Sequence, residues 1–123
     1  MATYRVDGSV LLSPVWFRWT GTAFETTVGA EDVKVRHVRR DPRVSFVVFE
    51  PWPPFRGLEA RGLVEITTEA VGEARRSIAI RYAGLERGTA YAAPRSHEGY
   101  LFRLRPEHLR AWDFADVLPA DPA

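Results

Sequence analysis

A short basic segment is the part of this sequence best suited to chemistry. Lys34 is the single lysine among 17 Lys and Arg residues, and three arginines follow it within six positions. On a helix that turns about 100° per residue, Arg36 and His37 lie opposite the intervening valines, with Lys34 at the margin of the same side. Lysine supplies a compact charge, and arginine a planar fork that can hold a phosphate through two hydrogen bonds. The segment therefore predicts a phosphate-binding face.

The residues before this segment bear on the same prediction. Thr26 and Thr27 end the preceding strand and could add hydroxyl donors, and a helix N-terminus favours anions. Glu31 and Asp32 are acids of the kind that commonly open a helix, and Asp32 would oppose a phosphate placed next to it. Basic surface helices without any ligand are common, so the charge pattern alone leaves both readings open.

The elements that must position these residues are mostly strands. Asp7-Gly8 and Thr20-Gly21 are turn signals that divide the first 28 residues into three strands. Alternation of apolar and polar side chains predicts further strands, and steps of three and four predict helices. The expected elements are a helix over 31–40, strands over 43–50 and 57–68, a helix over 69–83, a polar loop over 86–99 and a strand over 100–114 interrupted at Pro106.

This order predicts a mainly β fold, a small antiparallel barrel of six to seven strands with two helices. We expect one domain over residues 1–116 and a C-terminal tail over 117–123. The strands over 10–19 and 44–49 carry apolar side chains on both faces, whereas a barrel strand of a monomer has one face that is exposed to solvent and polar. That pattern favours a homodimer that packs barrel against barrel.

Composition excludes several classes of function. The chain has no cysteine, so a disulfide framework and a thiolate site are excluded. It has neither a signal-peptide pattern nor an apolar run long enough to span a bilayer, so we expect a cytoplasmic protein with no membrane association. The three histidines lack metal-ligand spacing, and no serine lies in a nucleophile motif. A net charge of +1 argues against a barrel that binds single-stranded nucleic acid.

Several motifs, taken in order, resemble a known family. "SPVWFRWTGTAFETTVGAEDVKVRHVRRDPRVSFVV", then "EARGLVE", and finally "RLRPEHLRAWDF" are similar to the pyridoxamine 5'-phosphate oxidase-like proteins, the flavin- and deazaflavin-binding split β-barrels. The likeness covers about residues 3–114. The "KVRHVRRDPR" form and the "WDF" ending look most like the branch that uses the deazaflavin coenzyme F420, in which a homodimer holds one cofactor in each groove between subunits.

The resemblance implies an F420-dependent oxidoreductase that transfers a hydride between the reduced cofactor and an unsaturated or carbonyl-containing small molecule. In such enzymes the cofactor carries the chemistry, so no catalytic side chain is assigned. The cofactor-binding residues implied by position are Ser13, Pro14, Val15, Thr26, Thr27, Val28, Lys34, Arg36 and His37. The residues expected to line the substrate pocket are Trp16, Trp52, Phe55 and Arg56, the last three from a loop that could reach the groove of a partner chain.

Two alternatives stay open. The first is an FMN-dependent oxidase or reductase of the pyridoxamine-phosphate-oxidase type, because FMN also presents a phosphate. The second is a non-catalytic member of the same fold that binds a flavin, haem or tetrapyrrole. The chain departs from the family in three places: His37 stands where asparagine is frequent, Asp32 precedes the basic helix, and the first strand opens the chain where relatives carry a helix.

Overall fold

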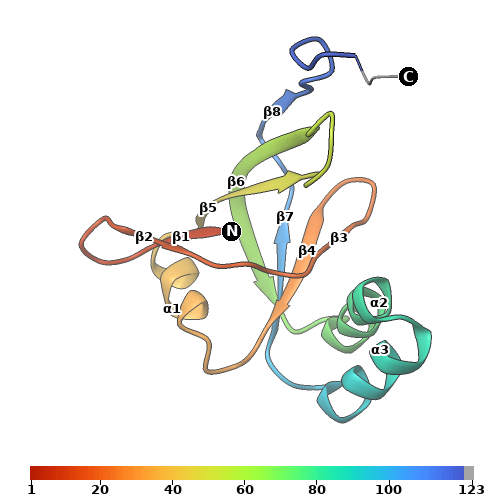
Figure 1. The fold of residues 1–123 in the computed structure, drawn as a ribbon. Helices are drawn as coiled ribbons and strands as arrows, with labels where there is room; N and C mark the ends of the chain where they lie inside the picture. Colours follow the sequence, from red (N-terminus) through yellow and green to blue (C-terminus); the bar gives the residue numbers. More distant parts are fainter. Residues whose placement is uncertain (121–123) are drawn as a thin grey trace.

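Eight antiparallel strands form the framework of the protein in the computed structural model, which describes residues 1–120 (Figure 1). The predicted mainly β split barrel is confirmed. The strands follow the order β2-β1-β5-β6-β7-β4-β3, with β8 paired to β6. The elements are β1 (Ala2–Tyr4), β2 (Val10–Leu12), β3 (Arg18–Trp19), β4 (Phe24–Val28), α1 (Val33–Arg40), β5 (Arg43–Phe49), β6 (Gly57–Thr67), α2 (Val71–Ala83), α3 (Leu85–Ala92), η1 (Ala93–Arg95), β7 (Tyr100–Leu104) and β8 (His108–Trp112).

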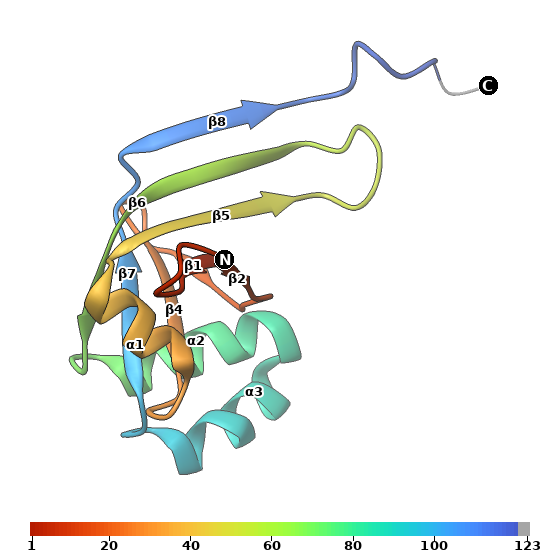
Figure 2. The ribbon, with the colours of Figure 1, turned by 90° about the vertical axis from the view of Figure 1, so that its left-hand side faces the viewer.

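Strand β6 joins the two halves of the barrel. Its first half pairs with β5 and β8, and from Val64 onward it pairs with β7 instead. Figure 2 shows β5, β6 and β8 running together as a long ribbon that extends beyond the body of the molecule. The alternation predicted for this strand is present, because Ala60 and Val64 are buried whereas Arg61 and Glu65 are exposed. Both halves of the barrel therefore depend on one continuous strand.

The core lies between the two halves of the barrel and under α1. It is made by valines of β4, α1, β5 and β6 together with two residues of β7, and apolar side chains such as Phe24 and Phe46 pack against it. The buried members are Val28, Val35, Val38, Val44, Val64, Phe102 and Leu104. Helix α1 is thus held by its two central valines, so the position of its polar side chains is set by core packing.

The prediction of one strand over residues 10–19 is wrong. The turn at Asp7-Gly8 does form a hairpin, in which Ala2 pairs with Leu12. Beyond Leu12 the chain leaves β1, crosses between the two halves, and pairs with β4 only from Arg18 onward. Pro14 lacks a backbone N–H and cannot continue a ladder of hydrogen bonds. The chain over 13–17 is therefore free to line cavities.

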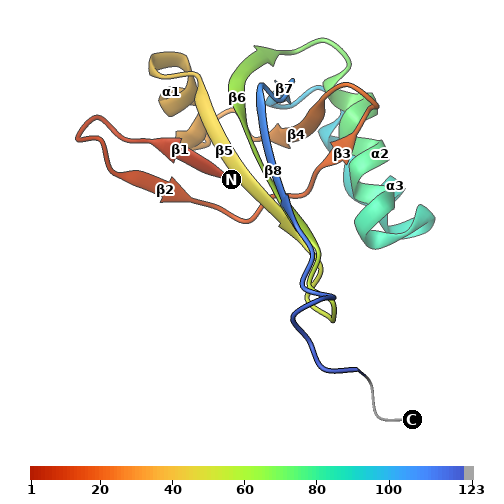
Figure 3. The same ribbon diagram turned by 90° about the horizontal axis from the view of Figure 1, so that it is seen from above.

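The predicted polar loop over 86–99 is also wrong over residues 86–95, because these residues form α3 and η1. Gly84 ends α2 as predicted, and its N–H donates to the carbonyl of Ile80. The chain then turns back, and Gly88 lies directly against the backbone of α2, where any Cβ would collide with Ala79 and Ile80. The missing side chain allows a close α2–α3 pair. Figure 3 shows this pair on the opposite side of the sheet from α1.

The second half of the outward face of β5 is apolar and exposed, in agreement with the two-sided pattern of the sequence. Val47 and Phe49 are 51% and 64% exposed. Beyond β8, residues 113–120 form neither helix nor strand, and 121–123 of the predicted tail lie outside the described residues. None of the helices within residues 1–120 combines the length and the apolar character that crossing a bilayer would require.

Candidate functional site

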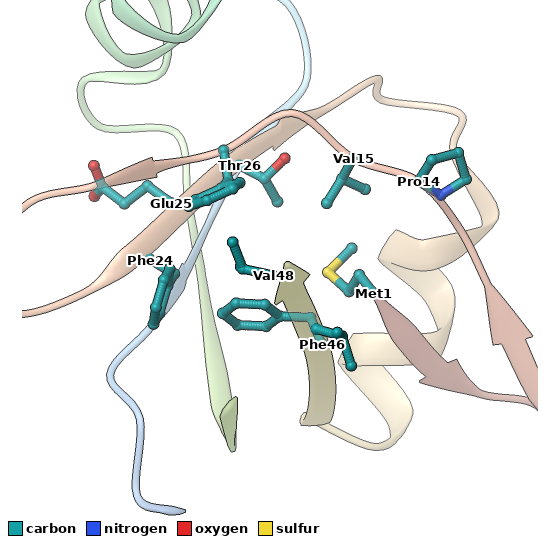
Figure 4. A pocket seen from close by; sticks show the side chains of 10 residues that line it. Met1, Pro14, Val15, Phe24, Glu25, Thr26, Phe46 and Val48 are labelled. Carbon is teal, nitrogen blue, oxygen red and sulfur yellow. The ribbon is translucent and has the colours of Figure 1, made fainter. Parts of the chain in front are cut away.

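Two adjoining cavities flank the connecting segment over 13–17. The first, here called the apolar cavity, has a volume of about 190 Å³. Figure 4 shows Phe46, Val48 and Met1 on one side of it, facing Val15 and Thr26 on the other. The carboxylate of Glu25 points away from it. Its lining consists of Met1, Pro14, Val15, Phe17, Phe24, Glu25, Thr26, Phe46, Val47 and Val48.

The second, here called the polar cavity, has a volume of about 300 Å³ and shares Pro14, Val15 and Thr26 with the first. Six of the nine predicted cofactor-binding residues come together here, along with Trp16 of the predicted substrate pocket. Its full lining is Pro14, Val15, Trp16, Thr26, Thr27, Val28, Gly29, Asp32, Lys34, Arg75, Ile78, Ala79 and Tyr91. The strand β4, the connecting segment and the start of α1 thus place these residues together.

Hydrogen bonds hold the connecting segment in place between the cavities. The hydroxyl of Thr26 donates to the carbonyl of Trp16. The N–H of Ser13 donates to the carbonyl of Met1 at 2.9 Å, and the amino group of Met1 donates to the carbonyl of Ser13. Ser13 itself is not among the residues that line either cavity. The shared wall of the two cavities is therefore an ordered stretch of backbone.

Lys34 lines the polar cavity but is paired with an acid. Its ammonium lies 2.8 Å from a carboxylate oxygen of Asp32, whose other oxygen accepts the backbone N–H of Lys34 at the start of α1. Burial acts to raise the pKa of Asp32, but the two hydrogen bonds from Lys34 outweigh it, and the pKa lies below its usual value. Asp32 is therefore ionised near neutral pH and neutralises the lysine.

The expectation that His37 lies on the exposed cationic face is wrong. The ring is only 6% exposed, and Nδ1 lies 2.9 Å from the hydroxyl of Thr3 in β1. Burial, followed by the positive charges of Arg40, Arg5 and Arg36, lowers the pKa of His37 below 6.5. A helical wheel fails here because β1 covers a second side of α1, so the buried face extends beyond the two valines.

The α2–α3 pair supplies a wall that the sequence analysis missed. Arg75, Ile78 and Ala79 of α2 and Tyr91 of α3 face the polar cavity. Trp16 stacks on Tyr82 with ring centroids 5.0 Å apart and planes 2° from parallel. The helical period of α2 contained a signal, because Arg75 lies next to the apolar positions 71, 74 and 78. The sequence predicts a loop where α3 lies, so it gives no position for Tyr91.

The remaining predicted residues lie away from both cavities in this chain. Arg36 is exposed on α1 and lines neither cavity. Trp52, Phe55 and Arg56 belong to the loop at the tip of the β5–β6 hairpin, where Arg56 pairs with Glu50 at 2.7 Å. Within residues 1–120 no group of three or more His, Asp or Glu side chains is arranged to hold a metal ion.

Comparison with known proteins identifies relatives of the chain. The sequence model of pyridoxamine 5'-phosphate oxidase matches residues 1–113. A conserved hypothetical protein of Mycobacterium tuberculosis, Rv2991, is 26% identical with a TM-score of 0.82, over 99% of this chain and 81% of that one. A protein described as an F420 reductase is 32% identical with a TM-score of 0.73, over 89% of this chain and 85% of that one.

More distant structures share the fold alone. HutZ, described as a haem storage protein of Vibrio cholerae, is 18% identical with a TM-score of 0.67, over 89% of this chain and 81% of that one. No protein of curated function matches the chain. Structures of this fold thus include a protein named for F420 and a protein named for haem.

Proposed function

The chain belongs to the pyridoxamine 5'-phosphate oxidase-like split-barrel family, and on this basis we propose that it is an F420-dependent oxidoreductase. It would transfer a hydride between the reduced deazaflavin and an unsaturated or carbonyl-containing small molecule. The 32% identity to a protein described as an F420 reductase supports this cofactor over others.

The observation that carries the proposal is the contact between the two cavities. One is lined mainly by aromatic and aliphatic side chains, and the other carries charged and hydroxyl groups, while Pro14, Val15 and Thr26 belong to both. A ligand site usually combines apolar walls with a few polar groups that fix orientation. A planar ring joined to a phosphate matches this division, with the ring against the connecting segment and the anionic end toward Lys34.

The residues of the chain have binding and shielding roles in this proposal. The bound deazaflavin would supply the hydride chemistry. The backbone of Pro14 and Val15 forms a fixed surface against which a ring can lie, since hydrogen bonds of Ser13 and Thr26 hold that segment. Trp16, stacked on Tyr82, forms one side of the polar cavity. No side chain is assigned as an acid or base.

The proposal includes a homodimer with the site at the subunit interface. The exposed apolar face of β5 supports it, because contiguous apolar surface of this kind marks association sites. The tip of the β5–β6 hairpin projects from the body of the molecule (Figure 2), so its Trp52, Phe55 and Arg56 are available to a partner's groove. In a dimer these three residues would complete the substrate pocket.

The test is a set of titrations with F420, FMN and haem, followed by absorbance and fluorescence. We expect F420 to bind most tightly, and the loaded protein to reduce members of a panel of enones and quinones. Preference for FMN with turnover would support the FMN-dependent alternative, and tight binding without turnover would support a non-catalytic carrier. Failure to bind any of the three would refute the cofactor proposal.

A mutation of Lys34 tests whether F420 binds in the polar cavity. Lys34→Ala should weaken F420 binding by about tenfold or more, because a charge-assisted contact is worth about 1.5–3 kcal/mol. The matched control is Arg39→Ala, which removes a charge from the exposed side of the same helix. If the Lys34→Ala variant and the parent bind F420 with equal affinity, Lys34 does not contact the cofactor.

A further inference from the structure

We propose that Arg75, on α2, recognises the phosphate of the ligand together with Lys34, and this inference rests on the proposed function. The titratable groups lining the polar cavity are Asp32, Lys34, Arg75 and Tyr91. Lys34 and Asp32 neutralise each other. In the protein without a ligand, the positive charge that remains in the cavity therefore comes from α2, and Lys34 contributes only where the ligand competes with Asp32 for it.

The burial of Arg75 strengthens this argument. The residue is 6% exposed, yet it forms no ion pair with any carboxylate of residues 1–120. One nitrogen of the guanidinium, Nη1, donates to the carbonyl of Arg95. Removing a charge from water is costly unless a counter-charge or several hydrogen bonds compensate it. An anion in the cavity would provide that compensation.

The other two guanidinium nitrogens are available to such an anion. Neither forms a hydrogen bond within the described residues, and neither is among their fully enclosed atoms without a partner. They therefore keep some contact with solvent, and the polar cavity is the one that Arg75 lines. A guanidinium whose Nε and Nη2 are both free is suited to a phosphate, which these two nitrogens can hold through two parallel hydrogen bonds.

Neighbouring arginines of α2 differ in this respect. Arg76 is exposed and lines a separate open surface with Thr68 and His97. Arg81 donates to the carbonyl of Phe17 and lies over its ring. Position 75 is thus distinguished by burial, by the absence of an acidic partner within residues 1–120 and by its place in the cavity wall. Arg76 provides a matched control in the next position of the same helix.

The experiment compares ligands that differ in their phosphate. FMN and riboflavin form one pair, and F420 and a phosphate-free deazaflavin form the other, each titrated into the parent, Arg75→Gln, Arg75→Lys and Arg76→Gln proteins. We expect Arg75→Gln to weaken the phosphate-bearing ligands by about tenfold or more and the phosphate-free ones by less than about twofold. Arg75→Lys should lose less, and Arg76→Gln should match the parent.

Several outcomes would overturn the assignment. Equal losses for both members of a pair would show that Arg75 only supports the fold, through its bond to Arg95. Unchanged phosphate-dependent binding in Arg75→Gln would also refute it, while leaving the proposed function intact. If Arg75→Gln does not fold, Arg75→Lys decides, since an equal loss of affinity for the phosphate-bearing and the phosphate-free ligand would contradict the role.

Failure of the proposed function is distinguishable from failure of this inference. If the parent protein binds none of the four ligands, the cofactor proposal is refuted. Inorganic pyrophosphate, titrated against the intrinsic tryptophan fluorescence to which the cavity-lining Trp16 contributes, then tests the cavity with a ligand that has no ring. A response lost in Arg75→Gln and retained in Arg76→Gln would uphold Arg75 as an anion site, and the absence of any response would refute it.

Discussion

The ammonium of Lys34 lies 2.8 Å from the carboxylate of Asp32, the residue that caps the same helix. Asp32 therefore occupies the position at the start of α1 that an external anion would otherwise take. It accepts the backbone N–H of Lys34 as well as its side chain. The affinity of the polar cavity for an anion depends on how this internal ion pair competes with the ligand.

Asp32→Asn should tighten the binding of F420 or FMN. The amide oxygen can still cap α1, while the negative charge that opposes a phosphate is removed and Lys34 is released. We expect a gain of up to about tenfold, which corresponds to about 1.4 kcal/mol. The measurement is a fluorescence titration, with Glu31→Gln as a control for loss of an exposed acid in the preceding position. Unchanged or weaker binding would mean that Lys34 does not meet the anion.

The buried His37 should make stability depend on pH in the mildly acidic range. Its pKa is lowered below 6.5 in the folded protein, so the unfolded chain binds a proton at a higher pH than the folded chain does. The stability that neutral His37 contributes to the folded protein is fully present above about pH 6.5, and it is lost as the pH falls toward the pKa of His37 in the folded protein. The free energy of unfolding should therefore decrease from pH 7.5 to pH 5.5, by at most about 1.4 kcal/mol per pH unit for this one proton.

Urea unfolding at a series of pH values checks this prediction. His37→Gln should flatten the dependence in that range, because glutamine cannot titrate. His108→Gln, which alters an exposed histidine of β8, should leave the slope as it is in the parent. Carboxylates with lowered pKa values, including Asp32, act in the same direction but at lower pH. An identical slope in the parent and in His37→Gln would contradict the assignment.

Glu25 should be the most costly carboxylate to remove. It is 2% exposed and accepts hydrogen bonds from Arg18 at 2.9 Å and from Arg103 at 2.8 Å, which ties β3, β4 and β7 together. Glu25→Ala leaves these guanidinium groups without their buried partner, a loss of about 3–5 kcal/mol in such pairs. Glu65→Ala, which removes a half-exposed partner of Arg103, is the control in chemical denaturation. Equal costs for the two variants would refute the prediction.

The outward face of β5 should hold two copies of the chain together. Phe49→Arg places a charge in this exposed apolar face and should dissociate the proposed dimer, since an unpaired charge is costly to bury at an interface. Val6→Arg alters a still more exposed apolar residue, at the β1–β2 turn, and should leave the assembly intact. Sedimentation velocity distinguishes these outcomes. A parent protein that sediments as a monomer would refute the dimer.

Local sequence patterns were enough to predict most of the elements. The alternation of 57–67, the turns at Asp7-Gly8 and Thr20-Gly21, and the stop at Gly84 depend on neighbours in the chain, and each is present in the structure. The same holds for α1, which begins at its acidic cap and ends at Asp41 before Pro42. Four of the six predicted cofactor residues in the polar cavity, Thr26, Thr27, Val28 and Lys34, also come together because a short turn joins β4 to α1.

Contacts between distant segments decided the features that local patterns did not predict. His37 is buried because β1, more than 30 residues earlier, covers the helix, and α3 forms because Gly88 fits against the backbone of α2. Arg75 faces the polar cavity only because α2 packs beside β4. The sequence alone determined the type of the elements and the basic character of α1. Tertiary packing decided which charges are paired and which remain available to a ligand, since these depend on side chains far apart in the chain.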